Sequence, residues 1–356
     1  EVTVLASRSA GADPIPRDEC VEYVDAVDLP LMFRASVLVA MYRWLRGRWR
    51  PGDIVIVNPD ALWLVPLLKR LGIEFVHLDV RTLPVNVQGI KGRLDWLLFW
   101  YLPMVLFGHR PDGYSFITRA LQREVERAFA FGRNRSVIWQ SGVDLAHFRQ
   151  SGPLRATERF QVFYHGAISI ERGIDKLVEA MTIRPLPFAA ELVIVGDGAD
   201  RVQLEQLARR NGPDPHVRFA GFIPYADVVS AIHGADVCVC PLPDRLEWNV
   251  SSPLKVLEYM ACGKPMILTP IASHREVVSD GRFVIWTAGF EATDVHDAIV
   301  RAWMQHEELT RAAAGARAML EGRFEWVDQA AKLDRYLLSA HADVESAALG
   351  MSGARQ

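Results

Sequence analysis

Short apolar runs rich in β-branched residues alternate with longer amphipathic stretches along nearly the whole chain. This alternation constrains the fold more than any other feature of the sequence. Strands separated by helices of this length are typical of βαβ units and parallel sheets. Strands covered on both faces are apolar throughout, as here. The expected strands are Val2–Ala6, Asp53–Val57, Phe75–Val80, Ser115–Thr118, Ser136–Trp139, Gln161–Tyr164, Glu191–Val195, Val217–Phe219, Val237–Pro241, Pro265–Leu268 and Phe283–Trp286, and the expected helices include Ile174–Met181, Arg201–Arg210, Tyr225–His233 and Leu254–Ala261.

A chain of 356 residues exceeds the usual size of one hydrophobic core, so two α/β domains are expected. The polar stretch 149–159 contains glycine and proline and precedes a fresh start of the alternation. We therefore expect one domain over 1–150 and a second over 151–323. Two such open sheets facing a cleft would place ligands at the carboxyl ends of their strands.

The last helix is expected over 324–341, where apolar and aromatic side chains recur at helical spacing, and we expect it to pack back on the first domain. Small and polar residues over 342–356 predict a disordered tail. The sequence begins with Glu1 and enters a strand at once, so we expect the first domain to lack its natural N-terminus.

Charge and cysteine content narrow the functional class. The net charge of −3 gives no sign of a nucleic-acid partner. Residues 1–150 carry 19 Lys and Arg against 16 Asp and Glu, and residues 151–356 carry 21 against 27, so the two halves differ in sign. Four scattered cysteines and the lack of a long apolar run predict a reduced, cytoplasmic protein without a membrane span.

The segment from Trp248 to Thr269 carries the densest chemical signal. Ser251 or Ser252 is expected to cap a helix whose first residue is Pro253. The free N–H groups and dipole at this end attract a diphosphate, and Lys255 adds positive charge. Glu258 lies one turn further on the same face, where it can accept hydrogen bonds from ribose. The alternative is a capped amphipathic helix with a solvent-facing lysine and glutamate.

This segment resembles the nucleotide-sugar motif of retaining GT-B glycosyltransferases of the family 4 type, in the subset with Ser-Pro-Leu-Lys. Other resembling segments occur in the family's order and cover about residues 110–340 well. They are Ser141-Gly-Val-Asp with Phe148, Tyr164-His-Gly-Ala with Arg172-Gly, Leu192-Val-Ile-Val-Gly-Asp-Gly, Val217-Arg-Phe-Ala-Gly-Phe-Ile and Ala235-Asp-Val-Cys-Val-Cys-Pro.

The resemblance implies the roles of individual residues. Glu258 would hold the donor ribose, and Arg172 would lie against the phosphates with Lys255. Phe222 and Ile223 would contact the nucleotide base. The other donor-binding positions implied by these segments are Gly166, Gly196, Ser252, Pro253 and Leu254.

The sequence departs from the family at two positions. Val250 occupies the place of the acid that usually lies near the donor sugar, and Asp244 or Glu247 is a candidate replacement. Ala167 occupies the place of a second phosphate-binding arginine, for which Lys255 can substitute. Gly196-Asp-Gly198 lacks the third glycine of a dinucleotide fingerprint, so a tight turn is favoured over an NAD site.

Two features of the front half bear on the acceptor. Asp79 and Arg81 end a predicted strand, where they would face acceptor or leaving phosphate, or else form a local ion pair. The aromatic and basic stretch 94–107 and the cluster around Arg43–Arg50 favour a membrane surface, with a buried helix and an ordinary basic surface as the alternative.

Together these features predict a hexosyltransferase that moves a sugar, with retention, from a nucleoside diphosphate donor to a hydroxyl of a glycan or lipid-linked acceptor in polysaccharide biosynthesis. No cofactor and no metal are expected, since no cluster of metal ligands is evident. The enzyme would be cytoplasmic, at the inner face of the membrane. A nucleotide-sugar epimerase of similar architecture and a catalytically silent binding protein remain open.

Overall fold

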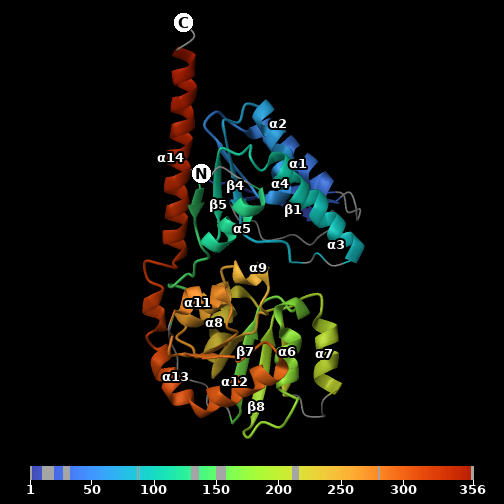
Figure 1. Cartoon of the computed structure of the whole chain (residues 1–356), viewed down its shortest axis with the longest axis vertical. Coiled ribbons are helices and arrows are strands. Elements are labelled where there is room, and N and C mark those ends of the chain that lie inside the picture. Colours follow the sequence, from blue (N-terminus) through green and yellow to red (C-terminus); the bar gives the residue numbers. More distant parts are fainter. Residues whose placement is uncertain are drawn as a thin grey trace. The chain divides into compact units, whose positions relative to one another are not determined.

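The structure is a computed structural model, and it describes residues 2–9, 20–26, 33–85, 87, 89–129, 136–149, 158–210, 216–279 and 281–353. The chain divides into two compact units (Figure 1). The first unit contains 1–116, 122–138 and 333–356, and the second contains 117–121 and 139–332. The division therefore falls earlier than the expected boundary at 150, which itself lies outside the described residues.

The second unit is built on one six-stranded parallel sheet with strand order β12-β11-β10-β7-β8-β9. Counted along the chain from β7, this is the order 3-2-1-4-5-6 of a doubly wound Rossmann-like domain. The strands are β7 (Phe160–His165), β8 (Ala190–Val195), β9 (Val217–Gly221), β10 (Val237–Cys240), β11 (Met266–Leu268) and β12 (Val284–Trp286).

Helices connect these strands and carry the apolar faces that complete the core. They are η3 (Ile170–Arg172), α6 (Ile174–Ala180), α7 (Arg201–Arg210), α8 (Tyr225–His233), α9 (Leu246–Asn249), α10 (Leu254–Ala261), α11 (Ala272–Val278), α12 (Ala292–Met304), α13 (His306–Ala313) and η4 (Ala316–Met319).

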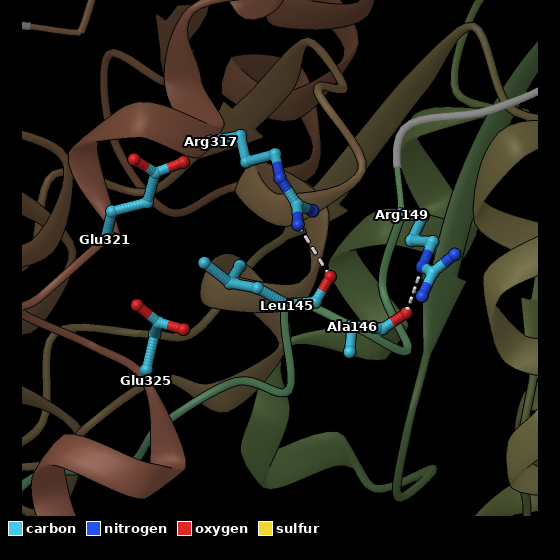
Figure 2. Close-up of a pocket in the computed structure, with 6 residues that line it drawn as sticks. All are labelled: Leu145, Ala146, Arg149, Arg317, Glu321 and Glu325. Atoms are coloured by element: carbon cyan, nitrogen blue, oxygen red, sulfur yellow. Dashed lines mark hydrogen bonds between the residues drawn. The ribbon is translucent and has the colours of Figure 1, made fainter.

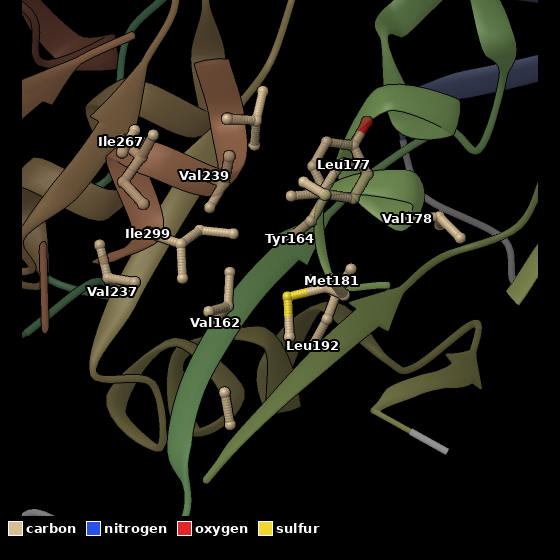
Figure 3. Packing of buried hydrophobic residues seen from close by; sticks show 14 of the residues in the cluster. Val162, Tyr164, Leu177, Val178, Met181, Leu192, Val237, Val239, Ile267 and Ile299 are labelled. Atoms are coloured by element: carbon tan, nitrogen blue, oxygen red, sulfur yellow. The ribbon is translucent and has the colours of Figure 1, made fainter. Parts of the chain in front are cut away.

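One continuous apolar cluster holds these layers together (Figure 3). Val162 and Val239 of the central strands are at most 1% exposed, and they pack with Leu177 of α6 and Ile299 of α12. Because a fully buried aliphatic side chain contributes about 1.5–3 kcal/mol, this cluster fixes the sheet and its strand ends as a rigid platform.

The first unit contains a four-stranded parallel sheet, β3-β4-β5-β6, and a separate parallel pair, β1-β2. The strands are β1 (Val4–Ser9), β2 (Val21–Ala26), β3 (Ile54–Val57), β4 (Phe75–Val80), β5 (Gly113–Phe116) and β6 (Ser136–Ile138). The sequence analysis did not predict β2, which is half polar and therefore lacks the continuous apolar run of the other strands.

The helices of the first unit are α1 (Phe33–Arg48), η1 (Pro59–Leu64), α2 (Val65–Arg70), α3 (Gly89–Trp96), η2 (Leu97–Tyr101), α4 (Leu102–Phe107) and α5 (Arg119–Phe129), whose first turn belongs to the second unit. The segments α3, η2 and α4 follow one another without a break, and η2 is a π-helical turn. Pro103 lies inside this continuous run, shortly after η2, where its missing N–H interrupts the helical hydrogen-bond ladder.

The C-terminal helix α14 spans Trp326–Gly353, so it continues through most of the stretch for which the sequence predicted a tail. The tail prediction is therefore wrong up to residue 353, and 354–356 lie outside the described residues. Residues 333–356 belong to the first unit, where Tyr336 lies 5.7 Å from the ring of His77 and His341 lies 5.7 Å from the ring of Phe75.

Candidate functional site

The candidate donor site lies in the second unit, at the carboxyl ends of β7 and β10. These neighbouring strands stand where the strand order reverses, the point at which doubly wound sheets bind ligands. The chain turns sharply at Gly166, with φ of 125°, and at Gly196, with φ of 131°. A Cβ on Gly196 would lie 2.1 Å from the carbonyl oxygen of Gly166, so this close contact requires glycine.

Helix α10 begins beside this turn and has no side-chain cap. Pro253 is its N-cap residue, with ψ of 88°, and the first backbone bond of the helix runs from Val256 to Pro253 over 3.0 Å. The expected cap by Ser251 or Ser252 and the expected helical position of Pro253 are therefore wrong. The N–H groups of Leu254 and Lys255 precede that first bond and point out of the helix end.

The two serines instead belong to a loop that other segments of the second unit hold in place. Ser252 accepts a 3.2 Å hydrogen bond from the N–H of Ser141, and the hydroxyl of Ser251 donates to the carbonyl of Trp248 over 2.8 Å. The hydroxyl of Thr118 donates to the carbonyl of Val250 over 2.6 Å. Because these oxygens are used within the loop, the helix end stays open to a ligand.

Two cations lie near the start of α10. The ammonium of Lys255 is 4.9 Å from the ring centre of Tyr164. The same ammonium lies close to Gly166, where an added Cβ would be 3.3 Å from Nζ. The guanidinium of Arg172 lies 4.8 Å above the ring of Trp248, which donates to the carbonyl of Glu171.

The charges of both cations act on the thiol of Cys240 at the end of β10. Burial raises its pKa, while the charges of Lys255 and Arg172 each lower it. The two cations therefore act on one place at the carboxyl end of the central strands. Their contact with a shared anionic ligand stays a prediction.

Glu258 is 4% exposed and is paired with His165 at the end of β7. Its carboxylate lies 2.7 Å from Nε2 of His165, and Nδ1 of the same ring lies 3.1 Å from the hydroxyl of Tyr259. The sequence analysis treated His165 as a packed histidine and gave it no role. The structure makes it the side chain that orients Glu258, and no short motif links these two positions.

The predicted base-contacting residues follow β9. Phe222 is 80% exposed, an unusual exposure for a large aromatic side chain, and Ile223 is half-buried. Next in the chain, Tyr225 stacks on His147 with ring centres 4.6 Å apart. The pKa of Tyr225 is raised by burial first and then by the charges of Glu258 and Asp144. Tyr225 and His147 thus adjoin the site, although the sequence analysis did not select them.

Val250, which occupies the place of the family's acid, is buried at 4% exposure. The two candidate replacements, Asp244 and Glu247, precede it in the chain and already have partners. Asp244 accepts a 2.6 Å hydrogen bond from Asn249, and Glu247 lies 3.6 Å from Arg245. Burial is the largest cause that raises the pKa of Glu171, and the charges of Glu247 and Asp200 raise it further. Several carboxylates therefore surround η3 and α9, each with a partner in the loop.

A separate open hollow of the second unit lies along the resembling segment Ser141 to Phe148 (Figure 2). It has a volume of about 760 Å³, and Figure 2 shows Arg317 reaching the carbonyl of Leu145. Arg317 also donates to the carbonyls of Phe148 and Ala261, the last residue of α10. This open hollow lies beside a structural brace, so we assign the donor to the strand ends instead.

Asp79 and Arg81, the predicted acceptor-side residues, lie in the first unit at the end of β4. Asp79 accepts a 2.6 Å hydrogen bond from Ser115, whose hydroxyl lies 2.8 Å from Nε2 of His77. Burial lowers the pKa of Arg81, and the charge of Asp79 raises it. Both residues line one pocket of about 430 Å³.

One group of potential ligand side chains was not evident in the sequence. Among the described residues, Glu74, His341 and Glu345 place one ligand atom each within 4.8 Å of one another. They belong to the first unit. Glu74 directly precedes β4, and the other two lie on α14, more than 260 positions later in the sequence. Residues this distant cannot be recognised as a group without the fold.

Part of the second unit is similar in sequence to known glycosyltransferases. Residues 159–305 match the family model described as "Glycosyl transferases group 1". Glycogen synthase of Mycobacterium tuberculosis is 23% identical over 230 residues, 64% of this chain and 54% of that protein. The putative glycosyltransferase EpsD of Bacillus subtilis is 31% identical over 153 residues, 39% of this chain and 38% of that protein. The chain thus spans about half the length of the curated relatives it matches.

Solved structures share the fold over nearly the whole chain. Sucrose-phosphate synthase of Thermosynechococcus elongatus superposes with a TM-score of 0.77 at 17% identity, covering 95% of this chain and 88% of that one. Anabaena HepE in complex with UDP-glucose superposes with a TM-score of 0.66 at 16% identity, covering 93% and 86%. The fold is therefore α/β and GT-B, with two Rossmann-like domains.

Proposed function

We propose that this chain is a group 1 glycosyltransferase that transfers a sugar from a nucleoside diphosphate donor to a hydroxyl of a glycan or lipid-linked acceptor. One observation carries the proposal. An uncapped helix end and two cations meet at the switch point of a doubly wound sheet, within the segment that matches the family.

The electrostatics of this site suit a leaving diphosphate. Lys255 and Arg172 supply two positive charges, and the N–H groups that begin α10 supply hydrogen bonds and a favourable dipole. Charge that develops on the leaving group in the transition state meets donors already in place, which is the main way such sites accelerate reactions. These groups neutralise the diphosphate themselves, so we propose that the reaction needs no metal and no other cofactor.

Glu258 is proposed to bind the donor ribose, with His165 fixing its carboxylate. Phe222 and Ile223 are proposed to cover the base. We further propose a hexose donor and retention of anomeric configuration, which rest on the resemblance to retaining enzymes of family 4. The HepE complex contains UDP-glucose, so uridine donors are the first to test.

The proposal and its two rivals differ in what happens to the donor. The protein should be incubated with UDP-, GDP-, ADP- and TDP-hexoses, with and without EDTA, and the products resolved by chromatography and NMR. A transferase slowly hydrolyses one donor and keeps its activity in EDTA. An isomerised donor would favour an epimerase, and binding without turnover would favour a silent protein. The relatives reported above are named as transferases or synthases, which favours the first outcome.

A Lys255→Met variant sharpens this experiment. Methionine keeps most of the apolar length of lysine and removes its charge, so nucleoside diphosphate affinity should fall about tenfold, an energy of ~1.4 kcal/mol. Lys332→Met is the matched control, since Lys332 lies on α14. Equal affinity for both variants in calorimetry would remove Lys255 from the phosphate site.

We also propose that the first unit binds a membrane surface. Among the described residues, no helix is long and apolar enough to cross a bilayer. The segment α3, η2 and α4 nevertheless carries an exposed apolar stripe. The exposed fraction of its residues ranges from 37% to 89%, and they are Ile90, Leu94, Leu97, Leu98, Tyr101, Val105 and Leu106. This interfacial stripe recurs every three or four positions and is flanked by exposed Lys91 and Arg93, a pattern that suits an anionic lipid surface.

Vesicle flotation tests the membrane proposal. The protein should float with vesicles of phosphatidylglycerol and phosphatidylcholine, and a Leu97→Asp/Val105→Asp variant should remain in the soluble fraction. Val202→Asp is the control, since Val202 is 67% exposed on α7 of the second unit. Flotation that is equal for all three proteins would contradict the role of the interfacial stripe. We further propose that the enzyme acts at the cytoplasmic face of the membrane.

A further inference from the structure

The pocket of the first unit lies where strands of its sheet end. Asn58 to Asp60 follow β3, and Asp79 and Arg81 lie at the end of the neighbouring β4. Ligands of open α/β sheets bind outside the carboxyl ends of the strands. The volume of about 430 Å³ falls within the range of roughly 300–1,000 Å³ that is typical of small-molecule sites.

The charges in this pocket come in balanced pairs. Arg34 lies 3.2 Å from Asp60, and the charge of Asp79 raises the pKa of Arg81 against the effect of burial. Asp95 also lines the pocket. The pKa of Asp60 is raised chiefly by burial, while the charge of Arg34 lowers it and the charge of Asp95 raises it. Three carboxylates against two guanidiniums leave no excess positive charge among the described lining residues.

This charge pattern argues against an anionic ligand. A phosphate dianion needs donors and cations that are not already matched by carboxylates, as at the proposed diphosphate site. Sugar hydroxyls have the opposite requirement, because each can donate to a carboxylate and accept from a guanidinium. The pocket therefore offers the mixture of acceptors and donors that an uncharged polyol can satisfy.

Two indole rings add an apolar wall. Trp96 and Trp100 are one turn apart on α3 and η2, and both line the pocket. Indole rings offer a flat apolar face that packs on the C–H face of a sugar ring. The indole N–H of Trp100 is also buried, and it has no hydrogen-bond partner among the residues that the structure describes. A π-helical turn such as η2 commonly marks a functional site.

We propose that this pocket binds the acceptor, and that it selects an uncharged saccharide ring rather than a phosphorylated group. The inference rests on the proposed glycosyltransferase function and adds the chemical class of the acceptor part in contact with the first unit. Asp79 and Asp95 accept hydrogen bonds from the sugar hydroxyls, Arg81 donates to them, and Trp96 stacks on the ring.

Saturation-transfer NMR tests the inference directly. The probes are methyl glycosides of glucose, galactose, mannose and N-acetylglucosamine, with inorganic phosphate and glucose 6-phosphate as the anionic arm. The full chain should bind at least one neutral glycoside, and phosphate should not displace it. Asp79→Asn and Trp96→Phe should each weaken this binding about tenfold, because each removes a direct contact.

Trp303→Phe is the matched control, because Trp303 is 42% exposed and stacks on Phe188 in the second unit. Its glycoside binding should equal that of the unchanged chain. Thermal melting of each variant shows that it is folded, and Trp96→Phe decides the matter if Asp79→Asn is unstable. Displacement by phosphate, or unchanged binding in the folded pocket variants, would overturn the inference.

Nucleotide calorimetry on the same samples separates this inference from the proposed function. If the unchanged chain binds no nucleoside diphosphate, the glycosyltransferase proposal fails whatever the glycosides do. If it binds nucleotide and hydrolyses donor, but the pocket variants accept a glycoside as well as the unchanged chain does, only the acceptor inference fails.

Discussion

At the end of β7, His165 contacts both Glu258 and Tyr259, two successive residues of α10. A carboxylate that is 4% exposed would lose much hydration on burial, and the imidazole replaces that hydration with a defined partner. The same pairing fixes the direction of the carboxylate before any ligand arrives. Preorganisation of this kind lowers the entropy that binding must offset.

Replacing Glu258 with glutamine should weaken nucleotide binding about tenfold to a hundredfold, since a hydrogen bond to a charged acceptor is worth about 1.5–3 kcal/mol. Glutamine is almost the same size and can keep the contact with His165, so the fold should survive. Titration calorimetry with the preferred nucleoside diphosphate measures the change. Glu308→Gln, exposed on α13, is the control. An unaltered affinity in Glu258→Gln would exclude the ribose contact.

Gly196 should not tolerate a side chain. In Gly196→Ala the new Cβ would meet the carbonyl of Gly166 at 2.1 Å, and φ of 131° is strained for alanine. We expect a loss of unfolding free energy of about 1–3 kcal/mol or more, together with weaker nucleotide binding, because the turn must move. Chemical denaturation measures the first effect. In Gly315→Ala, where the nearest atom is at 3.7 Å, stability should change by less than about 0.5 kcal/mol, and similar losses in both variants would contradict this account.

Among the elements, α10 shows how the two ends of one helix are used differently. Its first turn is left without a side-chain cap, while Arg317 of η4 donates to its last carbonyl, that of Ala261. A cation at a helix C-terminus is favourable, and the same guanidinium also ties down the carbonyls of Leu145 and Phe148. The brace at the closed end supports an open end that can accept an anion.

Arg317→Ala should therefore lower the unfolding free energy of the second unit by about 3 kcal/mol, since several carbonyls lose charged donors. Differential scanning calorimetry measures this change. Arg311→Ala removes an exposed arginine of α13 and should change stability by less than about 0.5 kcal/mol. Equal melting temperatures of the two variants would show that the brace adds nothing.

The helical segment from α3 to α4 also has two uses. Gly92, Trp96 and Trp100 face the pocket of the first unit, and Ile90, Leu94 and Leu97 are exposed on the interfacial stripe. Positions four apart share a helical face, so one amphipathic segment can line a saccharide pocket and contact lipid at the same time. This arrangement suits an acceptor in which a sugar is attached to a lipid.

At the scale of the whole molecule, each unit contains a buried histidine that makes its stability depend on pH. Burial lowers the pKa of His274 in the second unit to about 4 and that of His77 in the first unit to about 3. Both lie below the ordinary value near 6.5. Each histidine is therefore neutral in the folded chain and becomes charged on unfolding in mild acid.

The sign of the pH effect follows from these values. Above about pH 6.5 the unfolded chain gains no proton at these sites, so the stability is fully present. Below this the unfolded form binds protons that the folded form rejects, and stability falls by about 1.4 kcal/mol per pH unit for each histidine. The loss extends to about pH 4 for His274 and to about pH 3 for His77.

Urea unfolding at a series of pH values tests this prediction. His274→Gln should flatten the decline between pH 6.5 and 4, and His77→Gln should flatten it down to pH 3. A probe in each unit, such as near-ultraviolet circular dichroism of single-tryptophan versions, assigns the effect to its unit. A slope that neither substitution changes would mean that other groups control the acid sensitivity.

The local sequence determined the elements, because apolar periodicity and turn residues act over a few positions. The bounds of β4, α7 and α8 match the sequence predictions, and so does the α/β class. The local motif also placed Lys255 and Glu258 on one helix, whereas the role of Arg172 came from the resemblance alone. It failed at β2, whose polar pattern hides a strand, and at the tail, where a helix continues through small residues.

Only the tertiary structure decided which distant residues meet. The pairing of His165 with Glu258, the use of Ser252 by Ser141 in place of a helix cap, and the brace at Arg317 all join segments far apart in the chain. No local pattern encodes such contacts, because they depend on strand order and on the depth at which each side chain is buried. The strand order β12-β11-β10-β7-β8-β9 brings the ends of β7 and β10 together, and this is what places the proposed donor site.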